Sequence, residues 1–101
     1  MNPAKVDRHR RVTLTDLPNI GPAMAEDFRL LGIDQPGQLA NRDPFLLYEQ
    51  LYEITAARHD PCVIDVFISV TRFMSGDEPR PWWAYTEERK QLLAKKAGSK
   101  T

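Results

Sequence analysis

The chain has 101 residues, 42% of them hydrophobic and 28% charged, and its 14 basic and 14 acidic side chains give a formal net charge of zero. These values are ordinary for one globular domain and leave no room for two, and no apolar run approaches the roughly 20 residues that a membrane helix needs. Cys62 is the only cysteine, which excludes an intramolecular disulfide.

The first segment, residues 1–12, carries four bases and one acid and has no periodic apolar pattern. We expect a disordered basic tail there, and a second disordered tail at 97–101. The segment lacks the apolar stretch of a secretory signal, so we expect a cytoplasmic protein. Arg8, Arg10 and Arg11 can hold phosphate by releasing counterions, or they can form a solvated terminus.

The rest of the chain, residues 13–96, reads as a single helical domain that begins its helices with proline. Proline suits the first helical position because the missing N–H would have been unpaired there anyway. Pro22 follows Gly21 in this way, and Pro36 opens a short helix. Asp43 and Asp60 each precede a proline and can accept hydrogen bonds from the first-turn amides. Thr86 is the expected N-cap of the last helix.

Glycines indicate where the helices end, and the spacing of apolar residues predicts the helical segments before them. Gly32 and Gly76 each follow an apolar stretch and suit the left-handed residue just past a helix end. Apolar residues between 63 and 74 recur at the period of a helix rather than of a strand. The predicted helices cover residues 14–17, 22–31, 36–40, 44–57, 61–75 and 86–96.

The segment from Leu14 to Ala25 has the order apolar-x-x-Leu-Pro-x-Ile-Gly-x-x-x-Ala. We expect a short helix, a tight reversal in which Ile20 fills the gap between helices, and a second helix that starts at Gly21. Gly21 would allow backbone angles that a side chain forbids, and the small Ala25 would let the helices approach. The free amides at the second helix start then suit a phosphate.

This pattern is that of the helix-hairpin-helix motif, and further fragments make the resemblance more specific. The chain resembles the bacterial "pathogenicity locus" family, some of whose members are labelled mitomycin-resistance proteins, over about residues 13–90. Its layout is also similar to the C-terminal domain of competence regulators of the TfoX type. The resemblance implies a helical fold of the DNA-binding type and no defined activity. The fragments are Leu31-Gly32-Ile33, Asp43-Pro44, Leu47-Tyr48, Asp60 to Phe67, Pro81-Trp82-Trp83, Tyr85-Thr86 and Arg89-Lys90.

The sequence departs from the DNA-binding version of this motif in two ways. Asn19 replaces the first turn glycine, although asparagine tolerates left-handed angles. Neutral Ala23 and Met24 occupy positions where such hairpins often carry Lys or Arg. Glu26 and Asp27 follow and would repel phosphate unless they face away, as the helical wheel indicates. Binding of phosphate by the amides and a purely structural hairpin therefore both remain open.

Two other features have competing interpretations. Trp82, Trp83 and Tyr85 can stack bases or grip a partner, or they can anchor the linker to the core. Cys62, at a helix start beside Asp60, can be a reactive thiol or a small packed residue. We expect Asp65 to be a solvent-exposed acid with no chemical role. His59 and Cys62 lack further metal ligands at a recognisable spacing, so we expect no metal.

We therefore expect an all-α, compact helical domain with an N-terminal helix-hairpin-helix of the SAM-like type at about residues 14–31 and additional C-terminal helices. No catalytic motif is present, so we expect no enzyme, no cofactor and no small-molecule substrate. The first hypothesis is contact with DNA backbone without sequence choice, through Asn19, Gly21, Ala23 and Met24, with charge from the basic tail and from Arg89 and Lys90. The alternative is a protein-interaction or dimerisation module.

Overall fold

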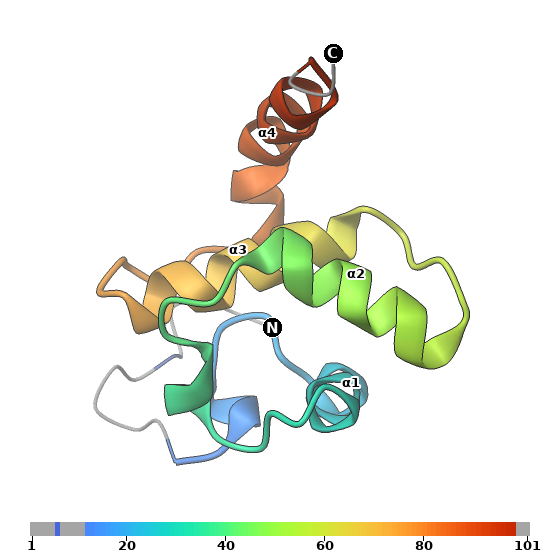
Figure 1. The fold of residues 1–101 in the computed structure, drawn as a ribbon. Coiled ribbons are helices and arrows are strands. Elements are labelled where there is room, and N and C mark those ends of the chain that lie inside the picture. Colours follow the sequence, from blue (N-terminus) through green and yellow to red (C-terminus); the bar gives the residue numbers. More distant parts are fainter. Residues whose placement is uncertain (1–5, 7–11, 99–101) are drawn as a thin grey trace.

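The computed structural model describes residues 6 and 12–98, with side chains as far as Lys95. Over this part the chain is all helical. It contains four α-helices, joined by 3-10 turns and short loops (Figure 1). The elements are η2 (Leu14–Asp16), α1 (Pro22–Leu30), η3 (Pro36–Leu39), α2 (Pro44–Thr55), α3 (Cys62–Met74), η4 (Trp82–Tyr85) and α4 (Thr86–Gly98).

Most helix boundaries follow the proline and glycine signals. Asp43 caps α2, since its Oδ1 accepts from the amide of Phe45 at 2.9 Å. Asp60 Oδ1 accepts from the amide of Cys62 at 2.9 Å and opens α3. Gly32 and Gly76 have φ of 80° and 115° and end α1 and α3 as expected. These ends are predictable because each depends on groups within a few residues in the chain.

The observed elements differ from the predicted ones at the short turns and at the last helix. The segment predicted as a helix over 14–17 is a single 3-10 turn, and the expected linker at residues 82–85 is also a 3-10 turn. α4 runs to Gly98 and so enters the range 97–101 expected to be disordered. Thr86 is the first residue of α4 and not its cap, and its hydroxyl donates to Asp65 at 2.7 Å.

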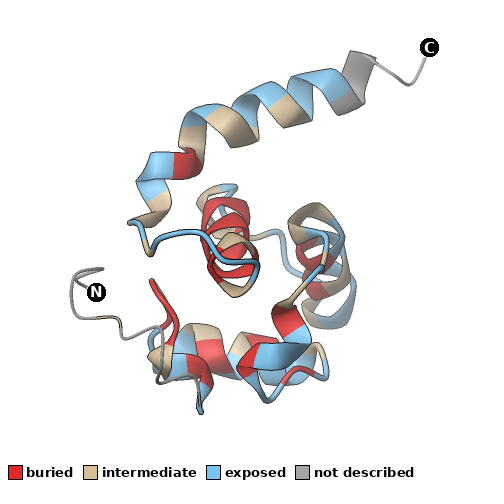
Figure 2. Ribbon diagram, turned by 90° about the vertical axis from the view of Figure 1, so that its left-hand side faces the viewer, coloured by how far each residue is buried: buried red, intermediate tan, exposed pale blue. Residues whose placement is uncertain are grey.

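Helix α3 is the centre of the fold, and every residue from Ile64 to Thr71 is buried. Helix α2 packs along it, and η4 covers another side. The rings of Phe28 from α1 and Phe67 from α3 meet with their centroids 5.3 Å apart. Burying side chains of this size stabilises the fold by about 1.5–3 kcal/mol each. Figure 2 shows buried residues along α3, whereas the described residues of α4 are exposed or half-buried and this helix projects from the body.

Candidate nucleic-acid interface

The chain reverses direction between η2 and α1 within residues 17–21, the N-terminal reversal. Leu17, Pro18 and Ile20 are buried, and Ile20 packs in the core as the sequence predicted. Asn19 has a φ of 66°, so it is the residue that takes the left-handed conformation. Ala25 is also buried, at the first turn of α1. The reversal therefore sets the start of α1 beside the core with its outer side in solvent.

The role expected for Gly21 was wrong in one respect. Its φ of −95° and ψ of −176° are extended backbone that any residue adopts, and an added β-carbon would meet no atom within 4 Å. Gly21 is therefore not required by backbone strain or by close packing. What glycine does here is leave the approach to the amides of α1 open.

The start of α1 lies at the surface. Gly21 and Ala23 are exposed and Met24 is half-buried. The helix begins with the bond from the amide of Ala25 to the carbonyl of Gly21 at 3.0 Å. Among the described residues, no carboxylate accepts from the amides of Gly21, Ala23 or Met24. These donors, together with the positive end of the helix dipole, make up a position where an anion is favoured.

The two acidic residues that follow Ala25 on α1, Glu26 and Asp27, differ in their exposure. Glu26 is exposed on the outer face of α1, as the helical wheel predicted. Its Oε2 forms an ion pair with Nη1 of Arg29 at 2.9 Å. Asp27 is half-buried rather than fully solvated. The charge of Glu26 is thus partly balanced by its neighbour one turn along.

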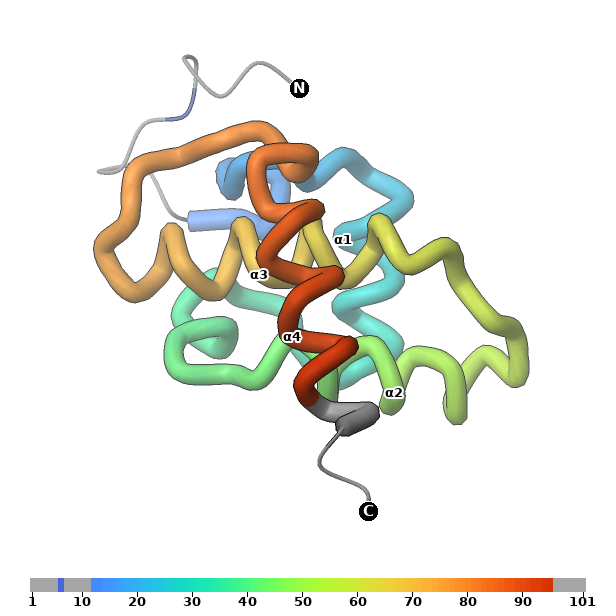
Figure 3. Tube along the Cα trace, turned by 90° about the horizontal axis from the view of Figure 1, so that it is seen from above, coloured from blue at the N-terminus to red at the C-terminus, as the bar shows by residue number. Residues whose placement is uncertain are grey.

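The side chain of Asn19 is engaged within the protein. Its Nδ2 donates to the hydroxyl of Ser69 at 3.0 Å and to the carbonyl of Arg80 at 2.8 Å. These bonds hold the loop before η4 against the reversal, so the two segments lie side by side although they are 61 residues apart (Figure 3). Arg80 is exposed and makes no ion pair with a described residue. Sequence reasoning missed Arg80, and its position between Pro79 and Pro81 was the available signal.

The other basic side chains proposed from the sequence as phosphate contacts are not shown to be available for that role. Arg8, Arg10 and Arg11 lie outside the described residues. Arg89 is not available as expected, because its Nε donates to Asp65 at 2.9 Å and its side chain is only 14% exposed. That hydrogen bond raises the pKa of Arg89. Lys90 is exposed, and its Nζ forms an ion pair with Oε1 of Glu87 at 4.0 Å.

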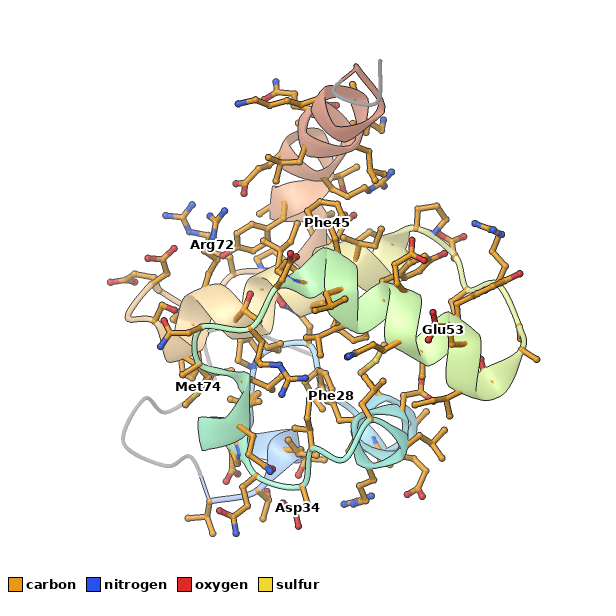
Figure 4. The ribbon with its side chains drawn as sticks, in the orientation of Figure 1. Phe28, Asp34, Phe45, Glu53, Arg72 and Met74 are labelled. Atoms are coloured by element: carbon orange, nitrogen blue, oxygen red, sulfur yellow. The ribbon has the colours of Figure 1, made fainter. Side chains whose placement is uncertain are left out.

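Asp65 is fully buried, which overturns its interpretation as an exposed residue of α3. One carboxylate oxygen accepts from Arg89 and the other from the hydroxyl of Thr86. A second contact between the same helices joins Arg72 to Glu88 through the two terminal guanidinium nitrogens, Nη1 and Nη2, at a half-exposed position. Figure 4 shows Arg72 and Phe45 on the side of the body from which α4 rises. Both pairs join α4 to α3.

The three aromatic side chains of η4 divide between the two roles considered for them. Tyr85 is 4% exposed and belongs to the core, and burial raises the pKa of its phenol. Trp82 is half-buried and packs against the core. Trp83 is 62% exposed and meets Trp82 edge to face at a centroid distance of 5.6 Å. Tyr85 and Trp82 thus anchor the turn, whereas Trp83 is presented to solvent.

Cys62 is half-buried at the start of α3. Burial, followed by the hydrogen bond and the charge of Asp60, raises the pKa of its thiol. A raised pKa argues against a reactive thiolate at Cys62 at neutral pH. Within the described part of the chain, no group of three or more His, Cys, Asp or Glu side chains is placed to hold a metal ion. No helix there is long and apolar enough to cross a membrane.

A raised thiol pKa gives a testable pH dependence. At neutral pH less of Cys62 is thiolate than in a free cysteine, so we expect iodoacetamide to alkylate it slowly, with a rate that rises at higher pH than for glutathione. Asp60→Asn removes the charge and should shift the rate profile toward lower pH. Mass spectrometry of the alkylated chain measures both profiles, and a D60N profile that coincides with wild type would contradict this assignment.

The described surface also has grooves and several exposed apolar side chains. One groove, of about 350 Å³, lies between the start of α2, α3 and α4 and is lined by residues that include Arg42, Phe45, Arg72 and Leu92. The exposed apolar side chains on α1 and α2 are Leu30, Leu46 and Ile54. Tyr52 is partly covered by the guanidinium of Arg58, 4.9 Å from its ring centre.

Comparison with known proteins identifies the chain's relatives. The mitomycin resistance protein McrB of Streptomyces lavendulae is 44% identical over 81 residues, which cover 80% of this chain and 77% of that protein. No solved structure gives a match. The model of the family described as pathogenicity locus, Cdd1, matches residues 7–91. With most of the chain covered by that model, the protein belongs to the pathogenicity locus family.

Proposed function

We propose that the protein is a non-enzymatic helix-hairpin-helix module that binds the backbone of DNA without sequence preference. The observation that carries the proposal is the start of α1 at the surface, where no carboxylate of the described residues accepts from the amides of Gly21, Ala23 or Met24. A phosphate oxygen can accept hydrogen bonds from such amides while the helix dipole favours its charge. Sequence preference is not expected, because the contacts are to phosphate.

The neighbouring charges support this assignment. Arg80 is held beside the reversal by the bond from Asn19 to its carbonyl, and its guanidinium makes no ion pair with a described residue. A single cation beside a helix N-terminus can contact the phosphate next to the one bound by the amides. The relative in Streptomyces lavendulae is named for resistance to mitomycin, a DNA-damaging drug, and a module that binds DNA fits such a role.

The direct test is fluorescence anisotropy of a labelled duplex as a function of salt. We expect dissociation constants of about 10⁻⁴–10⁻⁶ M near physiological salt, falling steeply at lower salt because binding releases counterions. Arg80→Ala should reduce the slope of log K against log salt by about 1. Absence of binding to every DNA form at about 50 mM salt would overturn the proposal.

Gly21→Asp separates binding from folding. Aspartate is a favoured N-cap and finds open space at this position, so the variant should fold at least as well as wild type. Its carboxylate would occupy the amides and repel phosphate, so we expect about a tenfold loss of affinity. Gly37→Asp is the matched control, since Gly37 also has open space around an added β-carbon and lies in η3. Equal affinities of the two variants would contradict the assigned site.

A second candidate function, a protein-interaction or dimerisation module, is favoured by the exposure of Leu30, Leu46 and Ile54. Large side chains of this kind at the surface are typical of contact patches when they gather on one face. Sedimentation of wild type and of the Leu46→Ser, Ile54→Ser double variant tests it. Concentration-dependent self-association that the double variant loses would support a dimer, and a monomer at all concentrations would exclude one.

A further inference from the structure

The turn η4 presents one aromatic side chain to solvent from a backbone that is fixed on both sides. Before it, Pro81 limits its own φ, and the carbonyl of Arg80 accepts from Asn19 at 2.8 Å. Within it, the amide of Ala84 donates to the carbonyl of Pro81 at 3.0 Å. After it, Tyr85 is 4% exposed in the core. Trp83 therefore extends from a rigid turn and not from a mobile loop.

The ring of Trp83 is also held from the side. Trp82 packs against the core and meets Trp83 at an interplanar angle of 83° with centroids 5.6 Å apart. An edge-to-face neighbour limits the motion of the second ring, while 62% of Trp83 stays exposed. An immobilised, accessible indole loses little conformational entropy when a flat ligand stacks on it.

The charge near this ring indicates which flat ligand it suits. Arg80 lies three residues before Trp83 in the same turn region, is exposed, and makes no ion pair with a described residue. A protein site for single-stranded nucleic acid combines these two elements, an aromatic platform for the base and a cation for the backbone phosphate. A paired base inside a duplex cannot reach such a platform without unstacking.

We propose that Trp83 is a stacking platform for an unpaired base, with Arg80 at the accompanying phosphate, so that the protein prefers single-stranded DNA to blunt duplex. The inference rests on the proposed function, because it specifies which form of DNA the module binds. It adds a contact with the base to the backbone contact at α1. The lack of hydrogen-bonding groups on the face of an indole predicts tolerance of all four bases.

The test compares a 12-nucleotide oligo-dT with a blunt 12-base-pair duplex at one salt concentration. We expect the single strand to bind several-fold tighter and to quench the tryptophan fluorescence. Trp83→Ala should weaken single-strand binding about tenfold, which is the size of effect that base stacking on one aromatic ring produces. It should leave duplex binding nearly unchanged, and Trp83→Phe should recover part of the affinity without the quenching.

Ile54→Ala, which removes another exposed apolar side chain, 53% exposed on α2, is the control and should bind like wild type. Equal binding of single strand and duplex, with no effect of Trp83→Ala, overturns this inference even when the Gly21→Asp variant still loses duplex affinity. A Trp83→Ala variant that loses self-association and keeps its DNA affinity also overturns it, since Trp83 would then contact protein. Absence of binding to any DNA overturns both the inference and the proposed function.

Discussion

Replacing Asp65 by alanine is expected to lower the free energy of unfolding by about 3–5 kcal/mol, because it leaves the partly buried guanidinium of Arg89 without its carboxylate. Thr86 would lose its acceptor at the same time. Urea denaturation followed by circular dichroism measures the change. Asp65→Asn keeps the volume and one acceptor oxygen, so we expect a smaller loss.

Glu88→Ala provides the matched comparison, since Arg72 and Glu88 join the same two helices. Their side chains are 43% and 35% exposed, against 14% and 0% for Arg89 and Asp65. Solvent screens a half-exposed pair, so we expect a loss of only about 1 kcal/mol or less. A double-mutant cycle over Asp65 and Arg89 isolates their coupling. Equal effects of D65A and E88A would show that burial of Asp65 does not govern the attachment of α4.

The contrast between these pairs shows where sequence reasoning reaches its limit. Asp65 lies four residues after Pro61, in the first turn of α3, and from the sequence an acid there is explained by capping and exposure. Its partners come from α4, 21 and 24 residues further along the chain. Because only the tertiary fold brings them together, the sequence could not assign Thr86 to Asp65 or remove Arg89 from the candidate cations.

Features set by near neighbours were predictable. Asp43 caps α2, Asp60 accepts from the first amide of α3, and Gly32 and Gly76 take positive φ, because each depends on bonds over a few residues. The candidate site was predictable only in part. The exposed start of α1 follows from the local pattern at Gly21. The approach of Arg80 depends on a side-chain bond across the fold.

Asn19→Ala is expected to lower the free energy of unfolding by about 2–3 kcal/mol, for two separable reasons. A φ of 66° costs alanine about 1 kcal/mol more than a residue suited to it. The two hydrogen bonds to Ser69 and Arg80 are lost as well, at about 1 kcal/mol each or less. Asn19→Gly keeps the backbone conformation and loses only the bonds, so urea denaturation should give it a smaller loss.

Asn41 is the natural control, because its φ of 64° matches that of Asn19 and its side chain is exposed. Asn41→Gly should therefore leave stability nearly unchanged, whereas Asn19→Gly should not. The same Asn19→Gly variant should weaken single-strand binding, because the carbonyl of Arg80 is no longer held and the turn that carries Trp83 loses its fixed position. A variant with reduced stability but unchanged single-strand affinity would show that η4 is held by Tyr85 and Trp82 alone, and that the reversal and the aromatic turn act independently.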